Sequence, residues 1–516
     1  MRHRRMSAVI YGILFSGAIL FGQNRMPLTS DTVVLTLELA PDQPPLQVTL
    51  AQMMSVFKEP GYSIAVIDHD RIAWAKGFGV TAAEGGKPVT AHTLFQAASI
   101  SKPVTAAGAL WLVEHGQLSL DEDVNHKLKS WQVPGNQFTA AQKVTLRRIL
   151  SHNAGLNVHG FDGYAQGQPL PTIEQTLDGL PPANNPPIRI TAVPGSECRY
   201  SGGGYTIAGI LIHDVSAQRF EQFMRQHVLL PAGMKESTFQ QSLPHSLAAH
   251  AATATDRNGQ PYPGKWRLYP ELAPDGLWTT PTDLAKFAIE IALSEGGRAN
   301  HVLSQLSVRE MLSPQCHDDP KRDGETGLGF ALGFPYLHRP DIFFHTGVNA
   351  GFESDLMMDP DHGWGFVTMG NSDNFVPVNR AIFRTLSDRY GWGVATSTRD
   401  LGDDLTIIRA LRNTQTALDY YRYMKSEGFN DLRHHVSTLD NFGHGLLGDK
   451  KFADAIRVFQ LNVAEYPQDT HTYDSLGEAY MDAGQRELAI QNYEKSLRLD
   501  PNNDNASARL KKLHSQ

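Results

Sequence analysis

A period of 34 residues near the C-terminus constrains the fold of this chain more than any other feature of its sequence. An apolar residue followed by glycine, then an alanine, an aromatic residue and a proline, return in the same order one period later. Two helices that pack closely need this pattern, because glycine and alanine allow the approach and aromatic rings fill the groove between them. Residues 437–516 are therefore expected to be helical. The recurring positions are Leu439, Phe442, Gly443, Leu446, Ala455, Phe459 and Pro467, followed by Tyr473, Leu476, Gly477, Tyr480, Ala489, Tyr493 and Pro501.

This spacing resembles the tetratricopeptide repeat, a helical hairpin that stacks into arrays. The resemblance implies that residues 437–516 bind a protein partner. The alternative is that the repeats only cap and stabilise the rest of the chain. Residues 396–436 are expected to contain a linker and further helices, and the amphipathic segment 404–430 is a candidate for a degenerate third repeat.

The first 22 residues predict an export signal or an N-terminal anchor. Arg2, Arg4 and Arg5 precede an uncharged stretch over 7–22, which is the pattern of a basic region followed by an apolar region. The stretch is shorter than the span of about 20 apolar residues that a transmembrane helix needs. We therefore expect export to the periplasm or the extracellular space, either with cleavage or with the segment kept as a membrane tether.

Charge and cysteine spacing exclude two kinds of ligand. The formal net charge is −8, without a basic run beyond the N-terminus, so no nucleic-acid partner is expected. Cys198 and Cys316 lie far apart and lack the spacing of metal ligands. We expect two small buried thiols, although an oxidising compartment would also permit a disulfide between them.

The region over 48–395 shows strand patterns at both of its ends, after an N-terminal segment over 23–47. Residues 61–80 alternate around a turn, which predicts a β-hairpin, and strand-like runs return over 328–371. Between them, helical patterns predict that one sheet is built from both ends of the region. Helices are expected over 99–115, 145–152, 204–226 and 281–294, the last capped by Thr282 or Asp283.

Ser99 and Lys102 form the pair with the clearest chemical meaning. If a helix begins near Ser99, Lys102 lies one turn further on the same face. A partly desolvated lysine can be neutral and accept the proton of a serine hydroxyl, which makes the serine a nucleophile. A second match, Ser55 to Lys58, is set aside because Pro60 ends the helix there.

Three further segments carry residues that suit the same chemistry. Tyr200 precedes a glycine-rich turn and a helix, where a phenol can move a proton. His345, Thr346 and Gly347 end an apolar strand, and the glycine allows a substrate backbone to approach an edge strand. Residues 144–156 form a short helix that enters a loop. Tyr200 could instead be a packed tyrosine of the core or of a turn, and His345 a structural histidine.

Taken in order, these segments resemble the serine β-lactamase and penicillin-binding superfamily, and most closely its branch of class C β-lactamases, DD-carboxypeptidases and esterases. The resemblance covers about residues 50–395. It implies an α+β fold, in which an antiparallel sheet is flanked by helices and carries a mostly helical insertion. The matching elements are Ser99-x-x-Lys102 for the nucleophile, Tyr200-Ser201-Gly202 for Tyr-x-Asn, and His345-Thr346-Gly347 for Lys/His-Thr-Gly.

The resemblance also implies a mechanism through an acyl-enzyme on Ser99. Lys102 would be the base for acylation, and Tyr200 would move protons to the leaving group. The backbone N–H groups of Ser99 and Val348 would form the oxyanion hole. His345 would bound the pocket, where it polarises Tyr200 or, if protonated, contacts a substrate carboxylate. No metal or organic cofactor is expected.

One departure from the family pattern affects the substrate. Gly202 replaces the asparagine that contacts a substrate amide, and no Tyr-x-Asn occurs in the chain. This favours a small ester or a D-amino-acid amide over a β-lactam. The alternatives are a DD-carboxypeptidase or β-lactamase that acts on cell-wall peptides, and a non-catalytic scaffold that binds peptides. An α/β-hydrolase and a zinc hydrolase are disfavoured, because neither Gly-x-Ser-x-Gly nor His-Glu-x-x-His occurs.

Overall fold

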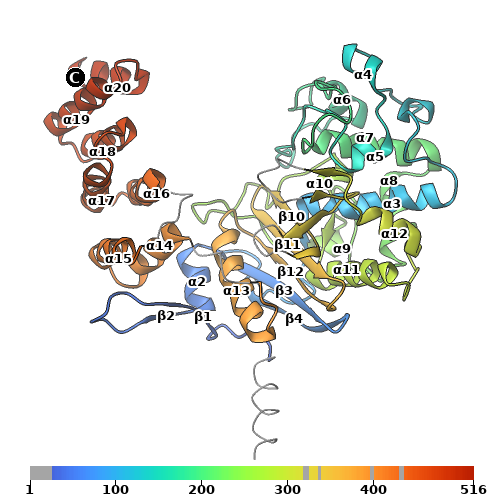
Figure 1. Cartoon of the computed structure of the whole chain (residues 1–516), viewed down its shortest axis with the longest axis horizontal. Helices are drawn as coiled ribbons and strands as arrows, with labels where there is room; N and C mark the ends of the chain where they lie inside the picture. Colours follow the sequence, from blue (N-terminus) through green and yellow to red (C-terminus); the bar gives the residue numbers. More distant parts are fainter. Residues whose placement is uncertain (1–25, 318–324, 335–338, 395–399, 429–434, 516) are drawn as a thin grey trace, which may run out of the picture. The chain divides into compact units, whose positions relative to one another are not determined.

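A computed structural model describes residues 26–317, 325–334, 339–394, 400–428 and 435–515. The chain divides into two units, Met1–Thr32 with Phe57–Ser397, and Val33–Val56 with Thr398–Gln516. Each unit is considered separately (Figure 1). The expected export segment, residues 1–22, lies outside the described residues. Within the described part, no helix has the length and apolar character needed to cross a membrane.

The first unit is built on an antiparallel sheet, which has eight strands over the described residues. Their order is β4-β3-β12-β11-β10-β9-β8-β7, so β3 from the start of the unit pairs with β12 from its end. The predicted hairpin and the prediction of one sheet from both ends are confirmed. The strands are β3 (Gly61–Asp68), β4 (Arg71–Gly79), β7 (Cys316–His317), β8 (Glu325–Thr326), β9 (Ala331–Phe334), β10 (Arg339–Asn349), β11 (Phe352–Asp359) and β12 (Trp364–Gly370).

Most of the described helices of the first unit lie in the chain between β4 and β7. Helix α11 begins at an N-cap Thr280, whose side chain accepts a 3.1 Å hydrogen bond from the backbone N–H of Asp283. The predicted caps Thr282 and Asp283 are wrong, because Pro281 already supplies the first helical φ. The elements between the outer strands include β5 (Phe95–Gln96), η1 (Ala98–Ile100), α3 (Ser101–Glu114), α5 (Leu146–Leu150), α7 (Gly202–Ser216), α10 (Leu272–Asp275), β6 (Trp278–Thr279), α11 (Pro281–Glu295) and α12 (Gln305–Met311).

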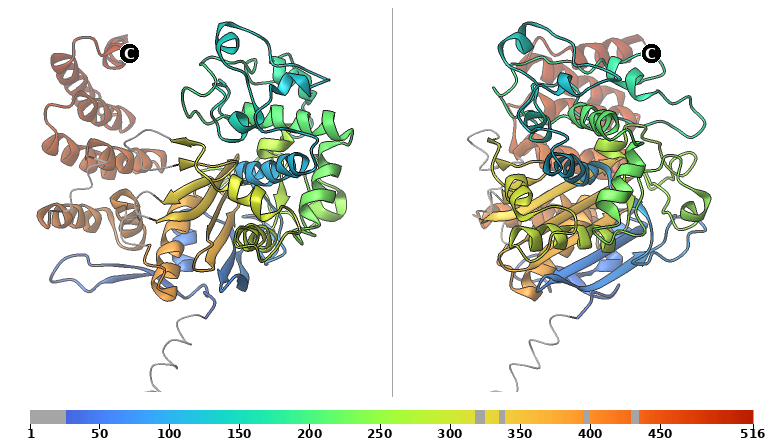
Figure 2. Two further views of the ribbon diagram at one scale, coloured as in Figure 1. Left: turned by 45° about the vertical axis from the view of Figure 1, so that its right-hand side comes forward. Right: turned by 90° about the vertical axis from the view of Figure 1, so that its right-hand side faces the viewer.

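Helices cover both faces of the sheet (Figure 2). Successive side chains of a strand point to opposite faces. On one face of β3, Ala65 joins the main hydrophobic cluster, against which α11 packs. On the other, the Tyr62 ring stacks on Phe375 of α13 (Phe375–Tyr390), with ring centroids 5.4 Å apart, and its hydroxyl donates to Asn379 at 2.6 Å. Strand β3 is therefore buried on both faces.

The second unit is mostly helical and contains the repeat. Gly443 lies so close to the Phe459 ring that an added Cβ would come within 2.5 Å of it. One period later, Gly477 faces the Tyr493 ring at 3.1 Å by the same measure. The predicted close approach of paired helices is therefore confirmed. The elements are β1 (Val33–Leu37), β2 (Leu46–Thr49), α2 (Leu50–Val56), α14 (Leu401–Leu411), α15 (Thr414–Ser426), α16 (His435–Gly448), α17 (Phe452–Glu465), α18 (Thr470–Asp482), α19 (Arg486–Leu499) and α20 (Asp504–Ser515).

Cys198 and Cys316 form a disulfide, with their Cα atoms 5.9 Å apart. The expectation of two separate thiols is therefore wrong. A sequence separation of 118 residues carries no information on proximity, which arises only when β7 joins the edge of the sheet. The bridge ties the segment just before Tyr200 to that edge.

Candidate active site

Ser99 lies opposite Asp275 because two short strands pair. Strands β5 and β6 are antiparallel, and the backbone N–H of Ala97 donates to Leu277 O at 2.8 Å, which extends their register. Two residues further along this register, Ser99 meets Asp275. Ala98 has a φ of 48°, in the left-handed region that costs a residue with a side chain about 1–2 kcal/mol. Such strain is concentrated at functional sites.

Lys102 is buried beneath the nucleophile, with 1% of its surface exposed. It follows Ser99 by about one helical turn, as predicted, and its Nζ donates to Ser99 Oγ at 2.8 Å. The same ammonium donates to Pro274 O at 3.1 Å and to Asp275 Oδ1 at 3.4 Å. The Ser99 hydroxyl in turn donates to Asp275 Oδ1 at 3.2 Å.

The surroundings of Lys102 favour its charged form over the neutral form expected from the sequence. Burial acts to lower the pKa of Lys102, but the charge of Asp275 and the Tyr200 side chain outweigh it and raise the pKa above its ordinary value. Lys102 is therefore an ammonium in the resting site. A charged lysine can stabilise negative charge on Ser99 Oγ, but it has no lone pair with which to accept a proton.

Tyr200 faces Lys102 within a group of histidines. The ammonium lies 5.0 Å from the centroid of the Tyr200 ring. The rings of His152, His159 and His345 lie 4.3, 4.9 and 6.3 Å from that of Tyr200. Sequence reasoning therefore placed Tyr200 beside the nucleophile correctly, but it missed His152 and His159.

Local hydrogen bonds fix the segment that carries Tyr200. The backbone N–H of Ser201 donates to His152 Nδ1 at 3.0 Å, so Nδ1 is an unprotonated acceptor. Ser201 Oγ donates to Val158 O at 2.7 Å and accepts from the N–H of Gly204, which caps α7. Burial, together with the charge of Lys102, holds the pKa of His152 well below its ordinary value, so its ring is neutral.

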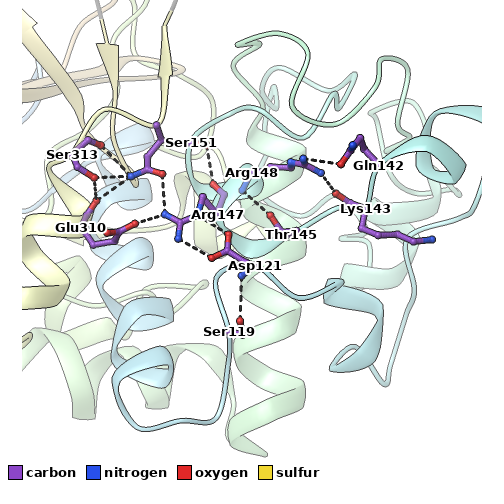
Figure 3. A network of polar contacts seen from close by, with 11 residues as sticks. Ser119, Asp121, Gln142, Lys143, Thr145, Arg147, Arg148, Ser151, Glu310 and Ser313 are labelled. Atoms are coloured by element: carbon purple, nitrogen blue, oxygen red, sulfur yellow. Dashed lines mark hydrogen bonds and ion pairs between the residues drawn. The ribbon is translucent and has the colours of Figure 1, made fainter.

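Arg147, which lies on the short helix just before His152, is held by a polar network (Figure 3). Arg147 of α5 forms ion pairs with Asp121 and Glu310 and donates to Gln315 at 2.9 Å. These carboxylates raise the pKa of the Arg147 guanidinium. Because α5 leads directly into His152, the network fixes the loop that the sequence singled out over 144–156.

His345 is buried on β10 and is neutral. Burial and the charge of Lys102 lower its pKa to about 3. Its Nδ1 lies 2.7 Å from Thr346 O. Of the two roles expected for His345, contact with a substrate carboxylate as a cation is therefore not supported, whereas a neutral ring beside Tyr200 is.

Gly347 brings β10 against the nucleophile. A Cβ at this position would lie 2.2 Å from Ala97 O, 2.5 Å from Ser354 Oγ and 3.1 Å from the backbone nitrogen of Ser99. Only glycine fits, and the reason is this close approach of two backbones. Val348 follows, 65% exposed, at the wall of the cleft. The backbone N–H groups predicted to form the oxyanion hole, those of Ser99 and Val348, come from these two segments, and that role stays a prediction.

A cleft of about 340 Å³ opens above Ser99. No lysine or arginine is among the described residues that line it. The lining residues are Ser99, His159, Gly160, Phe161, Tyr200, Asp275, His345, Thr346 and Val348.

Gly202 lies where the resembling family carries asparagine, and its surroundings are filled. A Cβ on Gly202 would come within 3.1 Å of His159 O and 3.3 Å of the Phe161 ring. The segment from His159 to Phe161 therefore occupies the space into which a side chain at 202 would project. The sequence showed the loss of the asparagine but not what replaced it.

Asp275 is the main site residue that sequence reasoning missed. It lies six residues before the helix that the sequence predicts over 281–294. The only local signal was an acidic residue directly before Gly276 and Leu277, and its meaning depends on the pairing of β5 with β6.

A serine paired with a buried lysine at the floor of a cleft defines a serine hydrolase site. Residues 50–387 match the β-lactamase family, and residues 471–503 match the tetratricopeptide repeat. The chain belongs to the β-lactamase family, as a β-lactamase-related serine hydrolase with a C-terminal tetratricopeptide repeat, which confirms the resemblance stated from the sequence.

Curated relatives and solved structures agree with this membership. The unguisins hydrolase of Aspergillus violaceofuscus is 27% identical, over 62% of this chain and 60% of the relative, so the match leaves out a substantial part of that protein. The protein flp of Staphylococcus aureus is 23% identical over 70% of each chain. The structure of D-amino acid amidase from Ochrobactrum anthropi superposes with a TM-score of 0.53 at 20% identity, over 66% of this chain and 98% of that one.

Proposed function

We propose that the protein hydrolyses a small neutral ester, or the amide of a D-amino acid, through an acyl-enzyme on Ser99. The observation that carries the proposal is the contact of 2.8 Å between Lys102 Nζ and Ser99 Oγ at the floor of an open cleft. The ammonium stabilises negative charge on the attacking oxygen. The names of two similar proteins, a hydrolase and a D-amino acid amidase, fit this reaction class.

The surroundings of Gly202 support an ester over a β-lactam. Peptide and β-lactam substrates present an amide that the family asparagine contacts, and here His159 and Phe161 fill that space. In a site without the asparagine, the amide of a bound substrate loses a hydrogen-bond partner, and an unpaired polar group lowers the affinity. A simple ester has no such amide, so the absence of the asparagine affects its binding less.

The charge of the cleft also argues against a substrate that carries a carboxylate. Lys102 is paired with Asp275, His345 is neutral, and no lysine or arginine is among the described lining residues. The carboxylate of a cell-wall peptide would be desolvated without a partner, which is costly. This argues against a DD-carboxypeptidase.

The test compares wild type with Ser99→Ala. We expect the wild type to turn over p-nitrophenyl acetate and to react with a fluorescent fluorophosphonate, and both activities to be lost in Ser99→Ala. A fluorescent penicillin should label neither protein. Stable penicillin labelling at Ser99 would instead favour a DD-peptidase. Absence of ester turnover and of all labelling would leave a non-catalytic scaffold.

The tetratricopeptide repeat supports a protein partner, as it is a common binding module. We propose that α16 to α20 recruit this partner to the hydrolase. Affinity capture with the full chain, compared with a chain that lacks 437–516, tests this proposal. Identical captured proteins from both would leave the repeats as a stabilising cap.

Export is proposed from residues 1–22, and the disulfide supports it. A bond between Cys198 and Cys316 persists in an oxidising compartment and is rare in a reducing cytosol. Fusion of residues 1–25 to alkaline phosphatase, which becomes active only after export, tests the proposal. An inactive fusion would contradict it.

A further inference from the structure

Asp275 contacts both members of the Ser99 and Lys102 pair. Its Oδ1 accepts from the Ser99 hydroxyl at 3.2 Å and from Lys102 Nζ at 3.4 Å, and the residue is only 4% exposed. Asp275 also lines the cleft together with Ser99. A structural ion pair with Lys102 would not require the second contact, between the buried Asp275 carboxylate and the nucleophile.

The direction of the hydrogen bonds identifies where the serine proton points. An ammonium has three N–H bonds and no acceptor, and here they point to Ser99 Oγ, Pro274 O and Asp275 Oδ1. Because Ser99 Oγ accepts from Lys102, its own proton must point elsewhere. The acceptor in that direction is Asp275 Oδ1.

We propose that Asp275 is a catalytic residue, which receives the proton of the Ser99 hydroxyl during acylation while Lys102 remains an ammonium that stabilises the attacking oxygen. This inference rests on the proposed serine hydrolase function. It assigns to Asp275 the part that the family resemblance assigned to Lys102.

The proton balance closes over the two steps. In acylation the Oγ–carbon bond forms, the Oγ–H bond breaks, and the proton moves to the Asp275 carboxylate. The bond from carbon to the leaving group then breaks, and Asp275 returns the proton to that group. In deacylation a water attacks the acyl carbon and gives its proton to Asp275, which passes it to Ser99 Oγ as the ester bond breaks. No oxidant, reductant or metal is needed.

Geometry and charge distinguish Asp275 from Lys102 as the acceptor. The groups that face the ammonium are Asp275, Tyr200, His152 and His345. Asp275 and Tyr200 stabilise its charge, while both histidines are neutral. Lys102 therefore lacks a lone pair in the resting state, and removing Asp275 removes the largest cause that raises its pKa.

The decisive experiment measures ester turnover against pH in the full chain with Asp275→Asn, which keeps the shape of the side chain. We expect kcat to fall by about 10²–10⁴-fold, the usual contribution of a positioned base, with KM nearly unchanged. The residual activity should rise toward alkaline pH, because Lys102 can then lose its proton and act as the base. Asp275→Glu should recover part of kcat.

Glu271→Gln is the matched control. Glu271 is a fully buried acid one helical turn before Asp275, and its carboxyl accepts from Thr176, while burial and, to a lesser extent, the charge of Asp275 raise its pKa. This variant should keep the kcat of the wild type within a few-fold and should not show the alkaline rise expected for Asp275→Asn. An Asp275→Asn protein with wild-type kcat and an unchanged pH profile would overturn the inference while leaving the proposed hydrolase intact. Loss of ester turnover in the wild type itself would instead defeat the proposed function, and the inference with it.

A second measurement does not depend on the folding of a variant. Nitrogen NMR of Lys102 in the wild type reports directly whether Nζ is protonated. An ammonium over the whole pH range of activity supports Asp275 as the acceptor, and a neutral amine in that range contradicts it.

Discussion

At the scale of single residues, the site joins one contact within a single helical turn to one contact across the fold. Ser99 and Lys102 lie about one helical turn apart, so their contact of 2.8 Å follows from spacing alone. Asp275 reaches the same site across 176 residues through a paired strand, and no local pattern records that. The charged form of Lys102 depends on the same long-range contact, because Asp275 is the largest of the causes that raise its pKa.

Lys102 and Asp275 should behave as a coupled buried pair. Lys102→Met leaves a buried carboxylate without its cation, which should lower the free energy of unfolding by about 3–5 kcal/mol. Adding Asp275→Asn to Lys102→Met should restore much of that loss but not the ester turnover. Denaturant unfolding of the wild type, both single variants and the double variant gives the coupling energy. Additive losses would show that the two side chains do not interact.

Gly347→Ala should impair catalysis more than folding. The added Cβ would lie 2.2 Å from Ala97 O, so β10 must move away from the Ser99 backbone. Misplacement by about 1 Å costs on the order of 10²-fold in rate, and we expect a loss in kcat of that size. The control is Gly135→Ala, where the nearest atom lies 3.9 Å away. Equal activity in both variants would contradict the close approach.

The lowered pKa of His345 should make the free energy of unfolding fall as the pH becomes acidic. Its pKa of about 3 in the folded chain is below the ordinary value of 6.5, so the unfolded state binds more protons between these values. The stabilisation is complete above the unfolded pKa and is lost as pH falls toward the folded one. Between about pH 7 and pH 5 the wild type should lose about 2 kcal/mol more than His345→Gln. Parallel stability curves for the two proteins would contradict a depressed pKa.

At the scale of secondary-structure elements, patterns with a clear period were predicted well. The hairpin of β3 and β4 and the sheet built from both ends follow from alternation and helical periodicity. The helix predicted over 281–294 matches α11, but its N-cap was placed at Thr282 or Asp283 instead of Thr280, because Pro281 is already the first helical residue. The region that forms the cleft wall carries few periodic signals, and its loop from His159 to Phe161 was not predicted.

The disulfide between Cys198 and Cys316 should contribute both to stability and to the placement of Tyr200. Cys198→Ser with Cys316→Ser opens a loop of 118 residues, and the loop-entropy model gives a loss of roughly 4–5 kcal/mol in unfolding free energy. Because Tyr200 follows Cys198 closely, ester turnover should fall as well. Thermal unfolding and turnover, with and without reductant, measure both effects. A double variant with wild-type Tm and kcat would show that the bridge supports neither.

At the scale of the whole molecule, the chain combines a sheet-based hydrolase unit with a helical repeat unit. The repeat was predictable because identical residue types recur at a fixed period. That residues 33–56 belong with the helical unit had no counterpart in the sequence pattern, since that grouping arises from long-range contacts. If each unit is stabilised by its own core, a change inside the repeat should alter stability without altering catalysis.

Two glycines of α16 allow that separation to be tested on one helix. An added Cβ at Gly443 would meet the Phe459 ring at 2.5 Å, so Gly443→Ala should destabilise the repeat by about 1–3 kcal/mol through overpacking. At Gly445 nothing lies within 4 Å, so Gly445→Ala should stabilise the helix by about 0.5–1 kcal/mol.

Calorimetry of the full chain should therefore show one transition that moves in opposite directions in the two variants. The transition of the hydrolase unit and the ester kcat should stay constant, because neither glycine belongs to that unit. A single transition that shifts as a whole, with kcat falling in Gly443→Ala, would mean that the repeats stabilise the catalytic unit. In that case their primary role would be that of a cap, and the proposal of a protein partner would lose its main support.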